Sequence, residues 1–163
     1  MMPYGKTAQH AIAAMSRLAE VYATGARTSS REIAEIRGLP QPIVAKVLTI
    51  LSQAGLIVGA PGPGGGYALT RPPDTITLLD VAELFDRQEQ AIGCPYGPRH
   101  CGNGPPCPLH ERTVVLRGQI RAFLESTTFA LFVGRGPGIS PSAEVPPVPL
   151  PPGVPPSGCE WDA

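Results

Sequence analysis

The chain has 163 residues and a mass of 17.1 kDa, which is the size of one domain or of one domain with an appendage. Lys and Arg together number 13, as do Asp and Glu, so no overall charge attracts the protein to nucleic acid. With 42% hydrophobic and 16% charged residues the chain is not disordered throughout, although 19 glycines and 21 prolines bring it close to low-complexity composition.

Helical periodicity and turn residues dominate the first 72 residues. The spacing of the apolar residues and the positions of Ser29, Glu32, Gly38 and Gly55 predict three helices. Two short apolar segments joined by a Gly/Pro loop predict a small hairpin after them. In chain order, the predicted elements are a helix over residues 6–23, a short helix over 31–37, a helix over 41–54, and a hairpin that pairs 56–58 with 67–69.

The second and third of these helices have the pattern of a helix-turn-helix. Ala34 lies four residues before Gly38, where closely crossing helices require a small side chain and the turn requires a positive φ. The alternative is an ordinary helical hairpin in a bundle. The hairpin that follows favours a winged helix-turn-helix, as does the charge of residues 1–72, in which seven Lys and Arg outnumber three Asp and Glu. The core shared by the two helices is expected to contain Ile33, Leu39, Val44 and Val47.

In a winged helix-turn-helix the second helix enters the major groove. Its exposed N-terminal part would place Gln41 to read a base edge, whereas Lys46 and Arg31 would contact phosphates. The glycines at 62–66 do not predict a phosphate cradle, because no helix follows them and Pro63 removes an amide donor. They fit a wing tip whose backbone approaches the minor groove. The candidate DNA-binding residues are Ser30, Arg31, Gln41, Lys46 and Gly64.

Residues 73–133 predict a short buried helix, a loop and a long helix. Apolar residues predict the short helix over 78–85, and Gly and Pro predict the loop over 93–108. The long amphipathic helix is predicted from about Leu109 to Phe132. Its apolar stripe is too extensive to remain exposed on a small domain, so we expect a dimer built through this helix. The stripe consists of Leu109, Leu116, Ile120, Phe123 and Leu124.

Three cysteines lie on the predicted loop, and a histidine follows it. The loop is too rich in Gly and Pro to pack as a core, and His110 comes three residues after the last cysteine. Three thiolates and one nitrogen ligand suit an iron–sulfur cluster or a zinc ion. The lack of a C-x2-4-C pair favours the cluster, and three unligated thiols are the remaining alternative. The candidate ligands are Cys94, Cys101, Cys107 and His110, with His100 and Cys159 as rivals for the fourth position.

The last 30 residues differ in composition from the rest of the chain. Residues 134–163 contain nine prolines and five glycines with almost no apolar period, which predicts a disordered tail. No stretch approaches the 18 apolar residues of a membrane helix, and no apolar leader follows Met1. Clustered cysteines without a secretion signal favour a reducing compartment. We therefore expect a cytoplasmic protein with no membrane partner.

Several of these segments occur together in a known order, namely 29–34, 48–56, 62–72, 76–81, 107–110 and 123–128. In this combination the chain resembles the Rrf-type winged-helix transcriptional regulators, a family that includes an iron–sulfur biogenesis regulator and a nitric-oxide sensor. The resemblance covers about residues 6–133. It implies a homodimer joined through the long helix, with Cys94, Cys101 and Cys107 ligating a 2Fe–2S or 4Fe–4S cluster near the interface. His110 then stands in the place of a fourth ligand.

The wing and the recognition helix depart from the common pattern of that family. Pro61 stands directly before the wing glycines, where many members have an arginine. Residues 40–43 read Pro-Gln-Pro-Ile, where polar or aromatic base-reading residues are common. The spacing between the first two cysteines is also one residue longer than the frequent one. Because Pro61 stands in place of that arginine, we expect weak minor-groove readout beside the wing.

The sequence thus predicts a mainly α-helical protein, a winged helix-turn-helix with a small β-hairpin wing and a long C-terminal dimerisation helix. The expected regions are a DNA-binding domain over 1–72, a cluster-binding loop and dimerisation helix over 73–133, and a disordered tail over 134–163. Without a nucleophile–base pair or paired carboxylates we expect no enzyme.

The function expected from the sequence is that of a homodimeric repressor. It would bind a palindromic operator in double-stranded DNA and sense redox state, nitric oxide or iron–sulfur status. One alternative is a winged-helix DNA-binding protein with structural zinc and no sensing role. An electron carrier that uses the cluster for redox transfer is the other.

Overall fold

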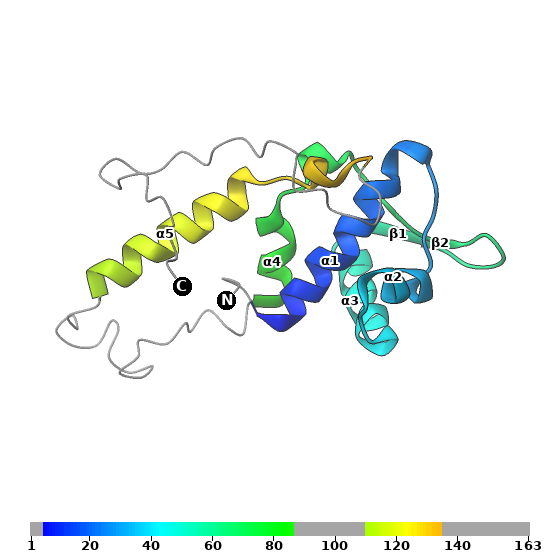
Figure 1. Ribbon diagram of the computed structural model, residues 1–163, viewed down its shortest axis with the longest axis horizontal. Coiled ribbons are helices and arrows are strands. Elements are labelled where there is room, and N and C mark those ends of the chain that lie inside the picture. Colours follow the sequence, from blue (N-terminus) through cyan, green and yellow to red (C-terminus); the bar gives the residue numbers. More distant parts are fainter. Residues whose placement is uncertain (1–4, 87–109, 135–163) are drawn as a thin grey trace, which may run out of the picture.

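The computed structural model describes residues 5–86 and 110–134 of the chain (Figure 1). Within these residues the fold is mainly helical and has one antiparallel hairpin. The α-helices are α1 (Lys6–Val21), α2 (Ser30–Arg37), α3 (Gln41–Gln53), α4 (Leu78–Asp86) and α5 (His110–Ser126). The hairpin consists of β1 (Ile57–Ala60) and β2 (Gly66–Leu69). Short 3-10 helices are η1 (Tyr22–Thr24), η2 (Pro73–Thr75) and η3 (Phe129–Phe132). This confirms the predicted fold class.

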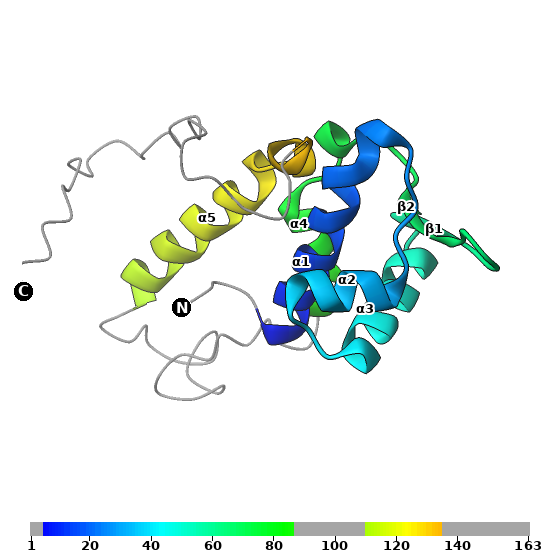
Figure 2. The same cartoon turned by 45° about the vertical axis from the view of Figure 1, so that its right-hand side comes forward.

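Helix α1 lies at the centre of the core. It contacts α2, α3, α4 and η3, and Figures 1 and 2 show it between the helix-turn-helix and α4. Four buried alanines allow this close approach on several sides, with Met15 and Leu18 filling the larger spaces. The predicted helix over 6–23 ends at Val21 because the chain tightens into η1 and then leaves through Gly25, whose φ is 67°.

Helices α2 and α3 form the predicted helix-turn-helix. Ser29 caps α2, since its hydroxyl accepts from the Glu32 N–H at 3.2 Å while the Glu32 carboxylate accepts from the Ser29 N–H. The turn passes through Gly38 at φ 61°, and the next N–H, that of Leu39, donates to the Ala34 carbonyl at 2.9 Å. The predicted shared core is confirmed: Ile33, Val44 and Val47 are fully buried, and Leu39 packs against them.

The hairpin that follows α3 is tied to the start of α2. Ile57 pairs with Leu69 and Ala60 with Gly66, which matches the predicted wing. Thr28, just before α2, forms a further antiparallel bridge to Tyr67, with N–H to carbonyl distances of 3.1 and 2.9 Å. Gly66 has no room for a side chain, because a Cβ there would lie 2.8 Å from the Thr28 carbonyl carbon. The wing and the helix-turn-helix therefore share one backbone network.

Helix α5 is shorter than predicted. It ends at Ser126, six residues before Phe132, because the chain becomes extended and Thr128 bridges to Thr77. The Leu78 N–H, at the first residue of α4, donates to the Thr127 carbonyl at 2.9 Å. The residue just after α5 thus supplies an acceptor for one of the first N–H groups of α4, which have none within their own helix. Phe129 then enters the core and is fully buried. These contacts replace the last turns of the expected helix.

No helix within residues 5–86 or 110–134 is both long and apolar enough to span a membrane.

Candidate nucleic-acid interface

Helices α2 and α3 and the wing lie together at one end of the molecule, whereas α5 extends away on the opposite side (Figures 1 and 2). Four of the five candidate DNA-binding residues lie on α2 and α3, and Gly64 lies on the loop of the wing. The structure thus brings these five residues to the same end of the molecule. Whether they bind DNA stays a prediction.

Helix α3 has one buried and one exposed face. Val44, Val47, Leu48 and Leu51 are fully buried against α1 and α2. The remaining positions of its first three turns are exposed, apart from the half-buried Ile50. Gln41 and Lys46 are among the exposed residues, so both candidates are accessible.

Arg31 and Glu35 form an exposed ion pair on α2. The Arg31 Nε donates to the Glu35 carboxylate at 2.9 Å, and their side chains are 77% and 64% exposed. The hydrogen bond and the charge of Glu35 raise the pKa of Arg31, whose guanidinium is a cation at physiological pH in any case. Because water screens such a pair strongly, Arg31 can exchange Glu35 for a phosphate at little cost.

A shallow hollow of about 370 Å³ lies where α2 and α3 meet. Arg31 and Glu35 line it from α2, Gln41 lines it from α3, and Ala34 and Leu39 form its apolar floor. Ser30 is half-buried at the first position of α2, where an α-helix leaves backbone N–H groups without an internal acceptor. Two predicted base and phosphate contacts, Gln41 and Arg31, therefore border one concave surface.

The tip of the wing is a glycine turn without large side chains. Gly62 and Gly64 have φ values of 97° and 75°, and the Gly65 N–H donates to the Gly62 carbonyl at 2.9 Å. A Cβ on Gly65 would lie 2.3 Å from the Ala60 carbonyl oxygen, so this position requires glycine. A strand follows the loop, which agrees with a wing tip and not with a phosphate cradle.

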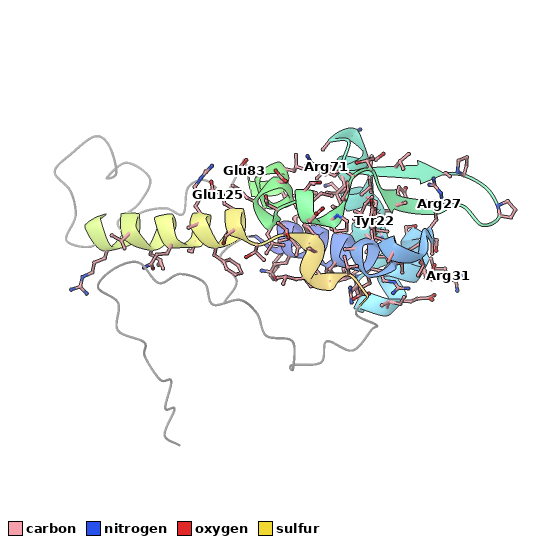
Figure 3. The ribbon with its side chains drawn as sticks, turned by 90° about the horizontal axis from the view of Figure 1, so that it is seen from above. Tyr22, Arg27, Arg31, Arg71, Glu83 and Glu125 are labelled. Atoms are coloured by element: carbon pink, nitrogen blue, oxygen red, sulfur yellow. The ribbon has the colours of Figure 1, made fainter. Side chains whose placement is uncertain are left out.

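Arg27 is a cation at the base of the wing that sequence reasoning missed. Its Nη1 lies 3.4 Å from the Val58 carbonyl oxygen and 3.3 Å from that of Gly66, so it spans both strands. Figure 3 shows Arg27 and Arg31 at the same end of the molecule. Within the described part of the chain, neither Arg27 nor Lys46 forms an ion pair. No sequence signal points to Arg27, because its partners are 31 and 39 residues away.

Two other arginines of the N-terminal region point into the protein. The Glu20 carboxylate, 2% exposed, lies 2.7 Å from Arg37 Nη2 and 3.2 Å from Arg17 Nη1. Arg37 also donates to the Ser16 hydroxyl and the Ala13 carbonyl, so it fastens the end of α2 to α1. Arg17 and Arg37 therefore contribute to the net charge of residues 1–72 but little to the charge exposed on the surface of that region. The cations near α3 and the wing are Arg27, Arg31 and Lys46.

The apolar stripe predicted on the long helix is divided between two surroundings. Leu124 is 5% exposed and Ile120 packs against the core, so both face the body of the chain. Leu116 is 55% exposed, and Val115 and Phe123 are also exposed. Leu116 and Phe123 share one side of the helix, whereas Val115 lies about 100° around it from Leu116. We call Leu116 and Phe123 the outer face of α5. Arg121 lies 3.4 Å from Glu83 of α4 and 2.8 Å from Glu125, two exposed ion pairs where α5 contacts α4. Figure 3 labels the two glutamates.

The sequence profile of the Rrf2 family, described as an iron-dependent transcriptional regulator, matches residues 4–135. The chain belongs to the Rrf2 family. The HTH-type transcriptional regulator IscR of Aliivibrio salmonicida is 32% identical over 94 residues, which are 58% of this chain and 55% of that protein. An HTH-type protein of Aquifex aeolicus is 36% identical over 99 residues, or 60% of this chain and 69% of its own. The Rrf2 assignment makes the protein a transcriptional regulator and not an enzyme.

Solved structures of two regulators share the Rrf2 fold described above. CymR, the global cysteine regulator of B. subtilis, has a TM-score of 0.67, with 81% of this chain and 97% of CymR covered at 23% identity. IscR of T. potens has a TM-score of 0.64, with coverages of 79% and 84% at 22% identity. Likenesses at these identities establish the winged-helix fold.

The candidate cofactor ligands of this Rrf2 chain fall mainly outside the described residues. Cys94, Cys101, Cys107 and their rivals His100 and Cys159 all lie there, and His110 is the first residue of α5. Among residues 5–86 and 110–134, no three His, Cys, Asp or Glu side chains lie close enough together to hold a metal ion. In the sequence, Cys94, Cys101 and Cys107 lie between the end of α4 and the start of α5, two helices that contact each other.

Proposed function

We propose that this Rrf2 protein is a homodimeric, iron–sulfur-containing repressor that binds a palindromic DNA operator. The observation that carries the proposal is the surface at the wing end. Arg27 and Arg31 lie there together (Figure 3), and the exposed face of α3 adds Lys46. Duplex DNA is a partner whose regular phosphate charge matches several cations gathered around an exposed helix face.

In the proposed complex, the first turns of α3 enter the major groove. Gln41 reads a base edge, and Lys46 and Arg31 contact phosphates on either side of the helix. The first-turn N–H groups of α2, at Ser30 and Arg31, offer further donors to a phosphate. The wing follows the adjacent minor groove with its glycine backbone around Gly64, and Arg27 supplies the charge that Pro61 does not.

The outer face of α5 supports the homodimer. Helix α5, which carries the exposed Leu116 and Phe123, extends away from the wing (Figure 1). Pairing this face with that of a second copy would remove the apolar surface from water and leave both α3 helices free. A two-fold pair of α3 helices reads a palindrome, because each subunit contacts one half-site.

The donor set supports the cofactor. Cys94, Cys101 and Cys107 would hold the cluster as thiolates, and His110, at the start of α5, would supply a nitrogen ligand. The family description as iron-dependent and the relative named IscR favour iron over zinc. When bound, the cluster supplies redox and iron–sulfur sensitivity to the segment between α4 and α5. This is the segment that precedes the proposed dimer helix.

Replacing any one of the three cysteines by serine is expected to abolish the visible absorbance of the anaerobically purified protein. Serine is a poor ligand for iron in such clusters, and the remaining two thiolates are too few to retain one. Spectra with iron and sulfide analysis of Cys94→Ser, Cys101→Ser and Cys107→Ser check this. Cys159→Ser is the control that should remain coloured, and His110→Ala should shift the spectrum. A colourless wild-type protein with stoichiometric zinc would contradict the cluster and favour the structural-zinc alternative.

Replacing Arg27 or Lys46 by alanine is expected to weaken binding to all DNA sequences alike. Each loses a phosphate contact, so the slope of log affinity against log salt should become less steep by about 0.9 per cation and per subunit. Fluorescence anisotropy at several salt concentrations measures the slope. Arg71→Ala is the matched control, since Arg71 is an exposed arginine paired with Asp80 of α4. Equal slopes for wild type and Arg27→Ala would remove Arg27 from the interface.

A further inference from the structure

The exposed face of α3 is built largely of carbon. Pro42, Ala45, Lys46 and Thr49 are spaced i, i+3, i+4 and i+7, which places them in one line along the helix. This line is opposite the buried face formed by Val44, Val47, Leu48 and Leu51. We call these four exposed residues the outer stripe of α3. Gln41 lies at its edge.

Thr49 is exposed, and its hydroxyl hydrogen is engaged within the helix, which leaves the methyl to contact a ligand. Its hydroxyl donates to the Ala45 carbonyl within the same helix at 3.0 Å, so its hydrogen is already used. Pro42 offers only ring carbons, and Ala45 offers only a methyl group. Lys46 is therefore the one residue of the stripe with a polar group free to donate to a ligand.

This chemistry does not suit base reading by hydrogen bonds. In the major groove each base pair displays donors and acceptors, and the one apolar group among them is the C5-methyl of thymine. An apolar side chain leaves any donor or acceptor opposite it unpaired, and only A·T pairs offset this by offering a methyl group. A thymine methyl has no hydrogen bond to lose against such a side chain, and packing the two together removes apolar surface from water.

We propose that the outer stripe of α3 selects DNA by packing Pro42, Ala45 and Thr49 against thymine methyl groups in the major groove. This inference rests on the proposed DNA-binding function and names what that function reads. Lys46, in the middle of the stripe, holds the helix to the phosphates while the three apolar positions face the bases. Thymine positions in each half-site then add to the sequence preference that Gln41 supplies.

The cations around the stripe argue for DNA and against an apolar protein partner. Arg31 borders the hollow beside Gln41, Arg27 lies at the base of the wing, and Lys46 belongs to the stripe itself. A protein surface apolar enough to match the three carbon positions would desolvate the Lys46 ammonium without a partner. The thymine-rich major groove offers methyl groups and flanking phosphates together.

The test begins by selecting duplexes for the full-length protein from a random-sequence pool. In the best duplex, thymines are then replaced by deoxyuridine, symmetrically in both half-sites and one pair at a time. Deoxyuridine keeps every hydrogen-bonding group and lacks only the methyl. We expect an affinity loss of about fourfold for each contacted methyl, which is the contribution of burying one methyl-sized group. A symmetric pair of replacements should therefore cost about 16-fold in affinity.

Thr49→Ser is the matched protein variant. It keeps the hydroxyl that bonds to Ala45 and removes only the methyl, so at one thymine position it should lose the discrimination against deoxyuridine. Thr75→Ser is the control, because that threonine also bonds to a backbone carbonyl, Pro72, but lies in η2 away from α3. It should discriminate like wild type.

Two results would overturn the inference while leaving DNA binding in place. One is a change below twofold for every deoxyuridine replacement in a duplex that the protein clearly prefers. The other is equal thymine discrimination by wild type and by Thr49→Ser at every position. A selection that yields no preferred duplex would contradict the DNA-binding function itself, and with it this inference.

Discussion

Leu116→Glu is expected to convert the dimer into monomers. Leu116 is 55% exposed and contributes little to the core of its own chain, so the substitution should leave the fold of each subunit intact. In the dimer it would place two carboxylates in a buried apolar contact, which is costly without a partner for each charge. Because a monomer contacts one half-site at a time, affinity for a palindromic operator should fall by about 10²–10⁴.

Light scattering coupled to size-exclusion chromatography measures the mass, and anisotropy measures the affinity. Gly118→Glu is the matched control. It introduces the same charge on α5 about 200° around the helix from Leu116, where an added Cβ meets no atom within 4 Å. Ile120→Glu is a poorer test, since Ile120 packs against the core of its own chain. If the Leu116→Glu variant remains a dimer, α5 does not form the interface.

Glu20→Ala is expected to destabilise the protein by about 3–5 kcal/mol, a large share of the stability of a small domain. Removing this buried carboxylate leaves Arg37 and Arg17 largely enclosed without a counter-charge. The end of α2 then keeps only the Arg37 bonds to Ser16 and Ala13 as its polar attachment to α1, so the helix-turn-helix should loosen first. Thermal or urea unfolding followed by circular dichroism measures the loss.

Glu35→Ala provides the comparison for Glu20→Ala within the same helix-turn-helix. It also breaks an Arg–Glu pair, but both members are exposed, so its effect on unfolding should lie within measurement error. It should also release Arg31 and strengthen DNA binding. Equal destabilisation by the two variants would show that burial of the Glu20 network does not support the fold.

The helix-turn-helix and the wing were predictable because their signals are local. Ser29 and Glu32 form their capping box within four residues, and Gly38 lies at the turn that requires a positive φ. The apolar spacing of α3 predicts its buried face directly. The glycine loop of the wing predicts a tight tip, as the structure shows.

Features that depend on distant contacts were not predictable. The end of α5 is set by the pairing of Thr128 with Thr77, some fifty residues earlier, and apolar periodicity alone continued the helix to Phe132. The inward direction of Arg37 depends on a glutamate in another helix. Arg27 joins the candidate interface only because two strands far along the chain place their carbonyls beside it.

The division of the α5 stripe has the same origin. Residues 116, 120, 123 and 124 share one side of the helix, but α4 covers only part of that side. Sequence periodicity reports that a face is apolar, and it does not report which neighbour covers each position. The structure assigns Ile120 and Leu124 to the chain's own core and leaves Leu116 and Phe123 exposed.

The measurement that most directly tests the account is a binding titration of cluster-containing and cluster-free protein. Both forms are titrated at two salt concentrations on the selected duplex and on a scrambled duplex of the same composition. We expect at least one form to bind the selected duplex about 10³-fold or more tightly than the scrambled one. We also expect the affinities of the two forms for the selected duplex to differ by about 5–150-fold. Equal affinity of both forms for the two duplexes would contradict the account.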